Sequence, residues 1–271
     1  MALDPLFLAT AIEGALAAGR THRSYFRTNL VVEKKGPIDL VTAADLESER
    51  LFRRLVGGRF PSHVVLGEET PAGPDAVGAP RWIIDPVDGT TNFAHGLALF
   101  CVSIALEVDG RIELGVVYDP MADELFTAER GVGAWLNGER LRVSARGALV
   151  DGLLCTGFPY SIRDRPAAQI DAFSAFLQRA RGVRRLGSAA LDLCYVAAGR
   201  FDGFWELQLN PWDFAAGILI VTEAGGAVTD YAGAPVKIAS SQIVASNGVL
   251  HQPMLAVLAS ALEAARAEGR G

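Results

Sequence analysis

The sequence predicts a mixed α/β (α+β) protein whose helices and sheets stack as a layered sandwich. Half of its 271 residues are hydrophobic, which is enough to bury one large core. Helical patterns at both ends and in the middle of the chain alternate with strand-like stretches, and this mixed order suits stacked layers. The sequence shows neither an internal repeat nor a linker between modules. We therefore expect a single domain spanning residues 1–271.

The N-terminal part of the chain predicts two helices separated by a polar, basic segment. Residues 4–19 follow an amphipathic helical pattern. The second helix is expected from Thr42 to Val56. Thr42 can cap it, Asp45 completes a capping box, and the pair Gly57-Gly58 is expected to end it.

Residues 63–127 are strand-like. The apolar runs at 63–66 and 82–84 predict two strands, and residues 71–80 between them form a loop rich in Pro, Gly and Ala. Residues 100–108 and 112–118 flank the turn Asp109-Gly110, which predicts an antiparallel hairpin.

The second half of the chain returns to a mixed pattern. Helices are predicted at 165–181, 189–198 and 213–224, and a further one after Pro253. Short strands are predicted at 203–207, 227–229 and 243–245.

The stretch WIIDPVDGTTNF at 82–93 is the most informative part of the sequence. It places Asp85 and Asp88 three residues apart at the end of an apolar run, with Pro86 expected to force a turn. Gly89 allows the backbone to approach a ligand closely, and Thr90 can begin a helix whose free amides attract phosphate. Carboxylates beside such amides suit Mg²⁺, which shares oxygen ligands with a substrate phosphate. An ordinary Asp-Pro-x-Asp-Gly surface turn remains the alternative.

Acidic residues recur at other element boundaries. Glu68 follows the apolar run at 63–66 and so repeats the arrangement of a strand that ends in a carboxylate. Asp213 lies at the start of a helical stretch, where it can also act as an N-terminal cap, as can Asp45 in its capping box. Each of these positions, taken alone, fits a structural role.

Composition narrows the classes of function. Twenty-five Lys and Arg against 31 Asp and Glu give a net charge of −6, so a general nucleic-acid surface is not expected. Three cysteines in apolar contexts are expected to be small buried hydrophobes in a reducing compartment. Neither a signal peptide nor a membrane-spanning segment is predicted, which indicates the cytoplasm.

Four motifs follow one another along the chain: DLVTAAD at 39–45, GEE at 67–69, WIIDPVDGTTNF at 82–93 and PWDFAAG at 211–217. Together they resemble the inositol monophosphatase family, the Mg²⁺-dependent, lithium-sensitive phosphatases that share a fold with fructose-1,6-bisphosphatase. The strings at 128–138, 156–159 and 187–193 are most similar to the bacterial inositol-1-monophosphatase branch. The resemblance covers nearly the whole chain and implies layers in the order α-β-α-β-α.

The resemblance also implies a role for each matching position. The metal ligands would be Glu68, Asp85, the Val87 carbonyl, Asp88 and Asp213, holding two to three Mg²⁺ ions, with Li⁺ as an inhibitor. Asp45 and Thr90 would orient and help deprotonate the attacking water, with Glu68 nearby. The substrate would contact the amides of Gly89 and Thr90, together with Ala189, Glu206, Asp213 and Lys34, although Lys35 leaves the last register open.

The implied reaction is hydrolysis of inositol 1-phosphate to myo-inositol and phosphate, and the implied assembly is a homodimer. Alternatives are another small substrate, namely fructose-1,6-bisphosphate, 3′-phosphoadenosine 5′-phosphate or histidinol phosphate, or a regulatory protein-binding role. Residues 160–164 do not align with the substrate-contacting segment of the family, so Ser161 and Arg163 are only candidates.

The remaining basic residues receive no catalytic role. The arginines at 179, 181, 184 and 185 are interpreted as a solvated or subunit-interface edge. None of the four histidines is assigned as a ligand, because Mg²⁺ prefers oxygen and only His95 lies near the acidic motifs in sequence. A place at the mouth of the site stays open for His95.

Overall fold

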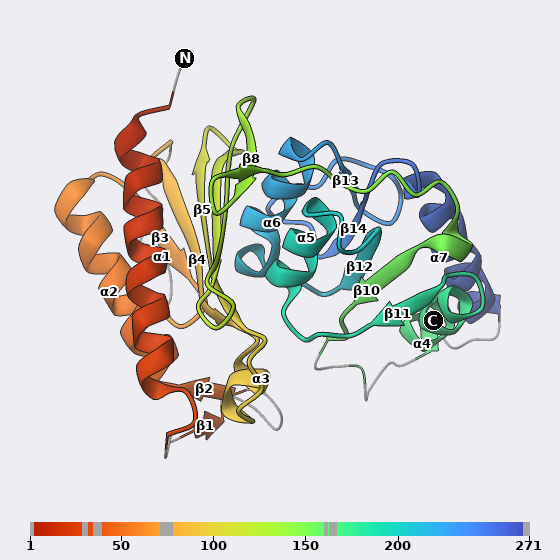
Figure 1. Ribbon diagram of the computed structural model, residues 1–271, viewed down its shortest axis with the longest axis horizontal. Helices are drawn as coiled ribbons and strands as arrows, with labels where there is room; N and C mark the ends of the chain where they lie inside the picture. The colour runs from red at the N-terminus through yellow and green to blue at the C-terminus, as the bar shows by residue number, and fades with distance from the viewer. Residues whose placement is uncertain are drawn as a thin grey trace.

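The computed structural model describes residues 3–28, 32–34, 40–70, 78–159, 162 and 167–267. In this part of the chain the elements form five layers, as Figure 1 shows. The helices of the first outer layer are α1 (Pro5–Tyr25) and α2 (Ala43–Arg59), those of the middle layer α5 (Ala189–Ala197) and α6 (Pro211–Glu223), and those of the other outer layer α4 (Ala167–Leu177) and α7 (His251–Ala267). One sheet lies on each side of the middle helices, so the expected α-β-α-β-α sandwich is confirmed.

The first sheet has seven strands, which neighbour one another in sequence order. They are β3 (Val64–Gly67), β4 (Arg81–Asp88), β5 (Cys101–Val108), β6 (Arg111–Asp119), β7 (Glu124–Glu129), β8 (Gly133–Leu136) and β9 (Glu139–Arg140). Strands β3 and β4 are parallel, and the other pairs are antiparallel. The predicted hairpin is therefore confirmed as β5 and β6.

The second sheet has five strands in the order β11-β10-β12-β14-β13. They are β11 (Gly182–Arg184), β10 (Leu153–Thr156), β12 (Gly203–Leu207), β14 (Gln242–Ser246) and β13 (Ala227–Thr229). The last three agree with the predicted strands, whereas β10 and β11 were not predicted. A two-stranded sheet of β1 (Val32–Lys34) and β2 (Leu40–Thr42), a short 3₁₀ helix (Leu149–Asp151) and the short helix α3 (Thr90–Ala94) complete the described elements.

Strand β4 is buried on both faces, which explains its continuous apolar run. Trp82 and Ile84 belong to the core beneath α1 and α2, whereas Ile83 belongs to the core on the α5 and α6 side. Because side chains alternate along a strand, this one segment joins two hydrophobic layers. Asp85 and Asp88, in the last half of β4, are consequently anchored by a well-packed strand.

Several helix boundaries differ from the prediction. Helix α1 continues beyond the predicted end at residue 19. Gly19 does not end the helix; it allows close packing, since a Cβ there would lie 2.4 Å from the Tyr118 ring. Helix α2 runs through Gly57 and Gly58 to Arg59, so the predicted stop is wrong. Neither glycine has the positive φ of a left-handed helix end, and both face open space.

One further helix start differs from the prediction. Helix α7 begins at His251, before the proline at its third position, where a missing N–H leaves no intrahelical bond unmade. The loop predicted at 71–80 and the start of the helix predicted at 165–181 lie largely outside the described residues. Within the described part of the chain, no helix has both the length and the apolar character needed to cross a membrane.

Candidate active site

Two parallel strands bring the first carboxylates to one edge of the seven-stranded sheet. Gly67 of β3 pairs with Ile84 of β4, so Glu68 and Asp85 follow at the same level. Parallel strands carry their carboxyl ends to the same edge, which explains why two distant motifs meet. The predicted arrangement of two strands that each deliver a carboxylate is thus confirmed for β3 and β4.

The segment from Asp85 to Asp88 forms a bulge in β4, so the turn expected at Pro86 is wrong. Pairing with β5 shifts between Asp85, which faces Ser103, and Asp88, which faces Cys101. Pro86 is tolerated because it sits where the ladder is interrupted and no N–H is needed. The alternative of a surface turn is also wrong, since Asp85 is 2% exposed and Asp88 is 8% exposed.

Local hydrogen bonds satisfy the backbone of this bulge. The Val87 amide donates to Asp85 Oδ1 at 3.0 Å. The Thr90 hydroxyl lies 2.9 Å from the Val87 carbonyl, and His22 Nε2 lies 2.8 Å from the Pro86 carbonyl. His22 is distant from the acidic motifs in sequence, and the fold brings it into contact with the bulge.

Gly89 takes the left-handed conformation predicted for a close approach, with φ of 98°. A Cβ at this position would lie 3.0 Å from the Leu99 carbonyl oxygen and 3.2 Å from that of Gly187. Gly89 is the N-cap of α3, so the prediction that Thr90 begins a helix is confirmed. Only a residue without a side chain fits this turn without strain.

Asp45 and Thr90 come together as expected, although they are far apart in sequence. Asp45 Oδ2 accepts the Thr42 amide at 2.9 Å and the Thr42 hydroxyl at 2.5 Å, so the predicted capping box is confirmed. Asp45 Oδ1 lies 3.3 Å from the Thr90 hydroxyl. The carboxylate thus caps α2 with one oxygen and reaches the candidate site with the other.

Asp88 is held by the start of helix α5. Its Oδ2 accepts the Ser188 hydroxyl at 2.6 Å and the Ala190 amide at 2.7 Å. Burial raises the pKa of Asp88, and the hydrogen bonds from Ser188, Ala190 and Ala189 oppose that rise. Ser188 and Ala190 were not predicted as site residues, and the string GSAALDL gave only a family resemblance. Ala189, which was predicted, lies in the first turn of α5 beside Asp88.

Asp213 and Glu206 enter the site from the second half of the chain. Asp213 lies in the first turn of α6, where its Oδ2 accepts the Asn210 amide at 2.7 Å in a capping box. Glu206 lies on β12 and is 9% exposed. Gly157 leaves room for this side chain, because a Cβ on Gly157 would lie 2.1 Å from Glu206 Oε1.

The carboxylates of the site repel one another. Burial raises the pKa of Asp85 well above its usual value, and the charges of Glu68, Asp88, Asp213 and Asp45 raise it further. Burial and the charge of Asp88 likewise raise the pKa of Asp213. The pKa of Glu206 rises to about 8 through burial first and Asp88 second, while Arg185 opposes it. Acidic groups from five separate segments therefore share one region.

This donor set fits hard divalent cations. Oxygen ligands suit Mg²⁺, and a cation would relieve both the burial and the mutual repulsion of the carboxylates. Among the described residues, no three His, Cys, Asp or Glu side chains are gathered into a complete set of metal ligands. Mg²⁺ does not require such a cage, because it keeps several waters and shares oxygens with substrate phosphate.

An ion pair on α2, with Glu49 buried and Arg53 partly exposed, supports the loop that carries Glu68. Glu49, 1% exposed, accepts the Glu69 amide at 2.8 Å and the Thr70 amide at 3.1 Å. Arg53 binds Glu49 at 2.8 Å and also reaches the Thr70 carbonyl at 2.9 Å. This pair was not predicted from the sequence, although Glu and Arg four residues apart on a helix are a recognisable signal of an ion pair.

The other predicted residues have different outcomes. The backbone of Lys34 lies in β1, but its side chain, Lys35, Ser161 and Arg163 lie outside what the structure describes. His95 is exposed and follows α3. The four arginines are exposed, at positions 179, 181, 184 and 185, with Arg184 on the edge strand β11.

The three cysteines are free and buried as predicted, at positions 101, 155 and 194. Cys101 lies 3.7 Å from Asp88 Oδ2 and 3.6 Å from the Ser188 hydroxyl, so it packs directly behind the candidate site. Burial raises the pKa of its thiol well above the usual value. A neutral thiol in this position acts as a small packing group.

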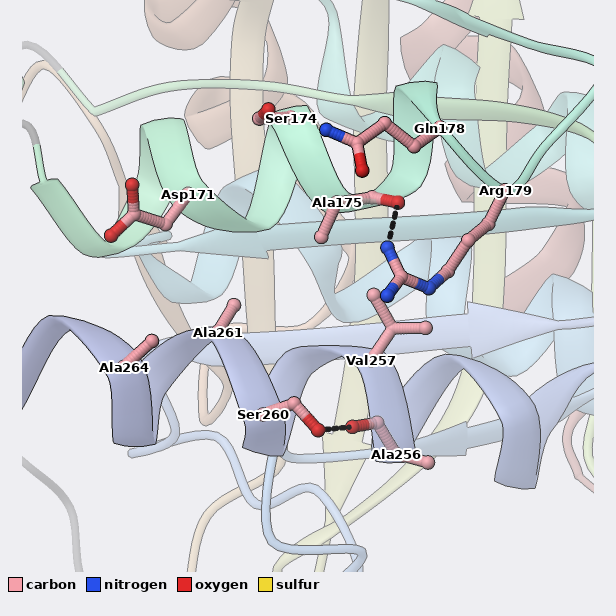
Figure 2. A pocket seen from close by; sticks show the side chains of 10 residues that line it. All are labelled: Asp171, Ser174, Ala175, Gln178, Arg179, Ala256, Val257, Ser260, Ala261 and Ala264. Carbon is pink, nitrogen blue, oxygen red and sulfur yellow. Dashed lines mark hydrogen bonds between the residues drawn. The ribbon is translucent and has the colours of Figure 1, made fainter.

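A separate hollow of about 450 Å³ lies between α4 and α7 (Figure 2). Small and polar side chains line it, including Ser174 and Gln178 from α4 and Ser260 from α7. None of the acidic residues described above contributes to its lining. The hollow is therefore a feature of the outer helical layer and no part of the candidate active site.

Comparisons with known proteins agree with this fold over nearly the whole chain. The model of the inositol monophosphatase family matches residues 5–266. An inositol-1-monophosphatase of Rhizobium meliloti (strain 1021) is 48% identical over 219 residues, 81% of this chain and 82% of that protein. A Nus factor SuhB of Salmonella typhimurium (strain 14028s / SGSC 2262) is 44% identical over 251 residues, 92% of this chain and 94% of that one. The structure of the extragenic suppressor protein suhB from Bartonella henselae has a TM-score of 0.90 at 42% identity, over 93% of this chain and 98% of that one.

The layered fold and these matches define the class of the protein as a phosphatase. The chain belongs to the inositol monophosphatase family. Members of this family generally depend on Mg²⁺, which agrees with the oxygen donors at the strand ends.

Proposed function

We propose that the protein is a Mg²⁺-dependent phosphomonoesterase that hydrolyses inositol 1-phosphate to myo-inositol and phosphate. The observation that carries the proposal is the buried group of mutually repelling carboxylates from Asp85, Asp88 and Asp213, next to the Asp45 and Thr90 pair. Such a group is costly in a folded protein unless a cation binds to it. The similarity to an inositol-1-monophosphatase over 81% of the chain supports the choice of substrate.

The metal ligands would be Glu68, Asp85, the Val87 carbonyl, Asp88 and Asp213. Bound Mg²⁺ supplies a water of lowered pKa and neutralises charge that develops on the departing alcohol oxygen. All of these groups offer oxygen ligands and lie at strand ends or at a helix start. We propose that they hold two to three ions.

Asp45 and Thr90 are proposed to orient the attacking water. The Thr90 hydroxyl carries a single hydrogen and lies within reach of both Asp45 Oδ1 and the Val87 carbonyl. When it donates to either acceptor, its oxygen lone pairs can accept a hydrogen bond from the attacking water, whose proton then passes to a carboxylate. Glu68 lies on the same sheet edge, where it can take part in moving that proton.

The substrate phosphate is proposed to contact the amides of Gly89 and Thr90, with Lys34 as an additional basic contact. The left-handed turn at Gly89 precedes α3, and the Leu99 and Gly187 carbonyl oxygens lie close to where a Cβ would be, so glycine allows these two amides to take this place. Phosphate hydrolysis passes through a loose transition state, so positioning and electrostatics contribute more than covalent chemistry.

Glu206 is proposed to recognise a hydroxyl of the alcohol, which favours a polyol substrate. The carboxyl is buried beside the acidic group and has room because residue 157 is glycine. A carboxylate accepts hydrogen bonds from hydroxyls, and a protonated carboxyl can also donate one. Ala189 and Asp213, near Asp88, would complete the alcohol side of the site.

The test is phosphate release from four substrates, with Mg²⁺ present or chelated. The panel is inositol 1-phosphate, fructose-1,6-bisphosphate, 3′-phosphoadenosine 5′-phosphate and histidinol phosphate. The proposal expects Mg²⁺-dependent release with preference for inositol 1-phosphate, and loss of release in the Asp88→Asn variant. Preference for another substrate would overturn the assignment of substrate, and Mg²⁺-independent release would overturn the metal mechanism.

A role as a Nus factor is the second candidate, because relatives with that name align over 92% of the chain at 44% identity. Such a role would not require turnover. Recovery of the same stoichiometric protein partner by wild type and by the inactive Asp88→Asn variant would support it. Absence of a recovered partner would favour the enzymatic role alone.

We also propose that residues 1–271 act as a single domain and that the protein is a homodimer inhibited by Li⁺. The match of one family model to residues 5–266 supports the first of these proposals. Sedimentation velocity decides the oligomeric state, and a monomer at micromolar concentration would contradict the dimer.

A further inference from the structure

His22 is a fully buried histidine that reaches the acidic bulge from the far side of the sheet. It lies in the last turn of α1 and is 0% exposed. Its Nε2 lies 2.8 Å from the carbonyl oxygen of Pro86, between Asp85 and Val87. The ring packs against Phe93 and Phe100, with centroids 6.1 Å and 5.9 Å away. The edges and faces of these two aromatic rings therefore fix the direction of the imidazole.

The Pro86 carbonyl occupies the part of β4 that the strand ladder skips. Pairing with β5 passes from Asp85 and Ser103 directly to Asp88 and Cys101. A buried carbonyl without a partner is strongly unfavourable, so a side chain must provide the donor that β5 does not. His22 provides it, whereas Thr90 serves the neighbouring Val87 carbonyl.

The contact defines the tautomer of the ring. A carbonyl oxygen only accepts, so the hydrogen must be on Nε2 of His22. Burial lowers the pKa of His22 to about 4, and the ring is therefore neutral near pH 7, with Nδ1 unprotonated. Among the described residues Nδ1 has no hydrogen-bond partner, consistent with its place against aromatic rings.

We propose that His22 is a positioning residue for the metal site, because its Nε2–H holds the Pro86 carbonyl and thereby fixes the bulge that aims Asp85, Asp88 and the Val87 carbonyl. The inference rests on the proposed function. His22 itself faces the backbone and no reacting group. Its effect passes along the backbone from Pro86, to Asp85 immediately before it and to Val87 and Asp88 after it, within the bulge.

The variants separate positioning from packing. His22→Leu removes the donor and keeps an apolar side chain, and His22→Gln keeps an N–H donor. His251→Leu is the matched control: His251 is also buried, 5% exposed, but it bonds Thr229 at 2.9 Å and Ser246 at 3.0 Å, away from the acidic strand ends. Each protein is examined for Mg²⁺ affinity by titration calorimetry and for its thermal unfolding midpoint.

We expect His22→Leu to weaken Mg²⁺ binding roughly tenfold or more, as removal of a partner behind metal ligands commonly does. His22→Gln should recover part of that loss, and His251→Leu should lower the unfolding midpoint without changing Mg²⁺ affinity. In wild type, the imidazole ¹⁵N spectrum should show Nε2 protonated and Nδ1 unprotonated at pH 7.

Two results would overturn the inference. One is unchanged Mg²⁺ affinity in His22→Leu or, if that variant does not fold, a wild-type imidazole ¹⁵N spectrum in which Nε2 of His22 carries no hydrogen. The other is equal loss of affinity in His251→Leu, which would make the effect one of general stability. If wild type itself binds no Mg²⁺, the proposed function fails first, so the two failures are distinguishable.

Discussion

Replacing Glu206 with glutamine removes a carboxyl group that the fold buries on β12 beside the acidic strand ends. Burial, with the nearby charge of Asp88, raises its pKa from 4.5 to about 8. The folded protein thus holds a proton that the unfolded chain releases between these two pH values. The contribution of this proton to the free energy of unfolding is fully present below pH 4.5 and is lost as the pH rises through about 8.

The size of the effect follows from linkage. Each pH unit between the unfolded and folded pKa values costs about 1.4 kcal/mol of folding free energy. Between pH 4.5 and about 8 the metal-free wild type therefore loses about 5 kcal/mol through Glu206. Glutamine has a similar shape and no charge, so the Glu206→Gln variant avoids this loss.

The assay is urea unfolding of both proteins in chelator at several pH values between about 5 and 8.5, a range that brackets the folded pKa. The variant should gain stability relative to wild type as the pH rises. Glu139→Gln, at an exposed position on β9, is the control and should follow the wild type throughout. If the free energy of unfolding varied with pH in the same way for wild type and Glu206→Gln, the burial of a carboxyl group at this position would be refuted.

Three further substitutions test neighbouring parts of the site. Thr90→Ala should lower kcat by roughly 10²–10⁴-fold, because the Thr90 hydroxyl orients the attacking water. The Mg²⁺ concentration for half-maximal rate should change less. An unchanged kcat in initial-rate assays would contradict this role. Gly157→Ala places a methyl 2.1 Å from Glu206 Oε1, so KM for the polyol substrate should rise while Mg²⁺ affinity stays constant; a normal KM would place the substrate elsewhere. Glu49→Gln should lower the free energy of unfolding by about 1–3 kcal/mol and weaken Mg²⁺ binding, because one of the two loop amides loses its acceptor. Denaturant titration measures the stability and calorimetry the Mg²⁺ affinity. Wild-type values of both would show that the loop does not depend on Glu49.

The sequence predicted the layers and the acidic strand ends because both depend on local patterns. Apolar runs followed by Asp or Glu identified β3 and β4, and the capping box at Thr42 identified the start of α2. Strands β10 and β11 escaped prediction because each has only three or four residues and pairs in parallel with distant segments. Short parallel strands carry little periodicity of their own.

The distant contacts of the side chains that support the site from behind could not be predicted from sequence patterns. His22 and Glu49 lie on helices whose surroundings are set by sheet packing, and their partners are 64 and 20 or 21 residues away. The bulge at Pro86 shows the same limit: proline predicts an interruption of pairing, but whether the chain turns or continues depends on the donors that neighbouring elements provide.

Titration calorimetry of Mg²⁺ into wild type and Asp88→Asn, with circular dichroism to confirm that both are folded, measures most directly whether the acidic strand ends bind metal. The prediction is clear binding to wild type and strongly weakened binding to the variant, because the substitution removes one charge from the ligand group and leaves an oxygen to accept from Ser188 and Ala190. Equal affinity and stoichiometry in both proteins would contradict the placement of the metal at Asp88 and, with it, the proposed mechanism.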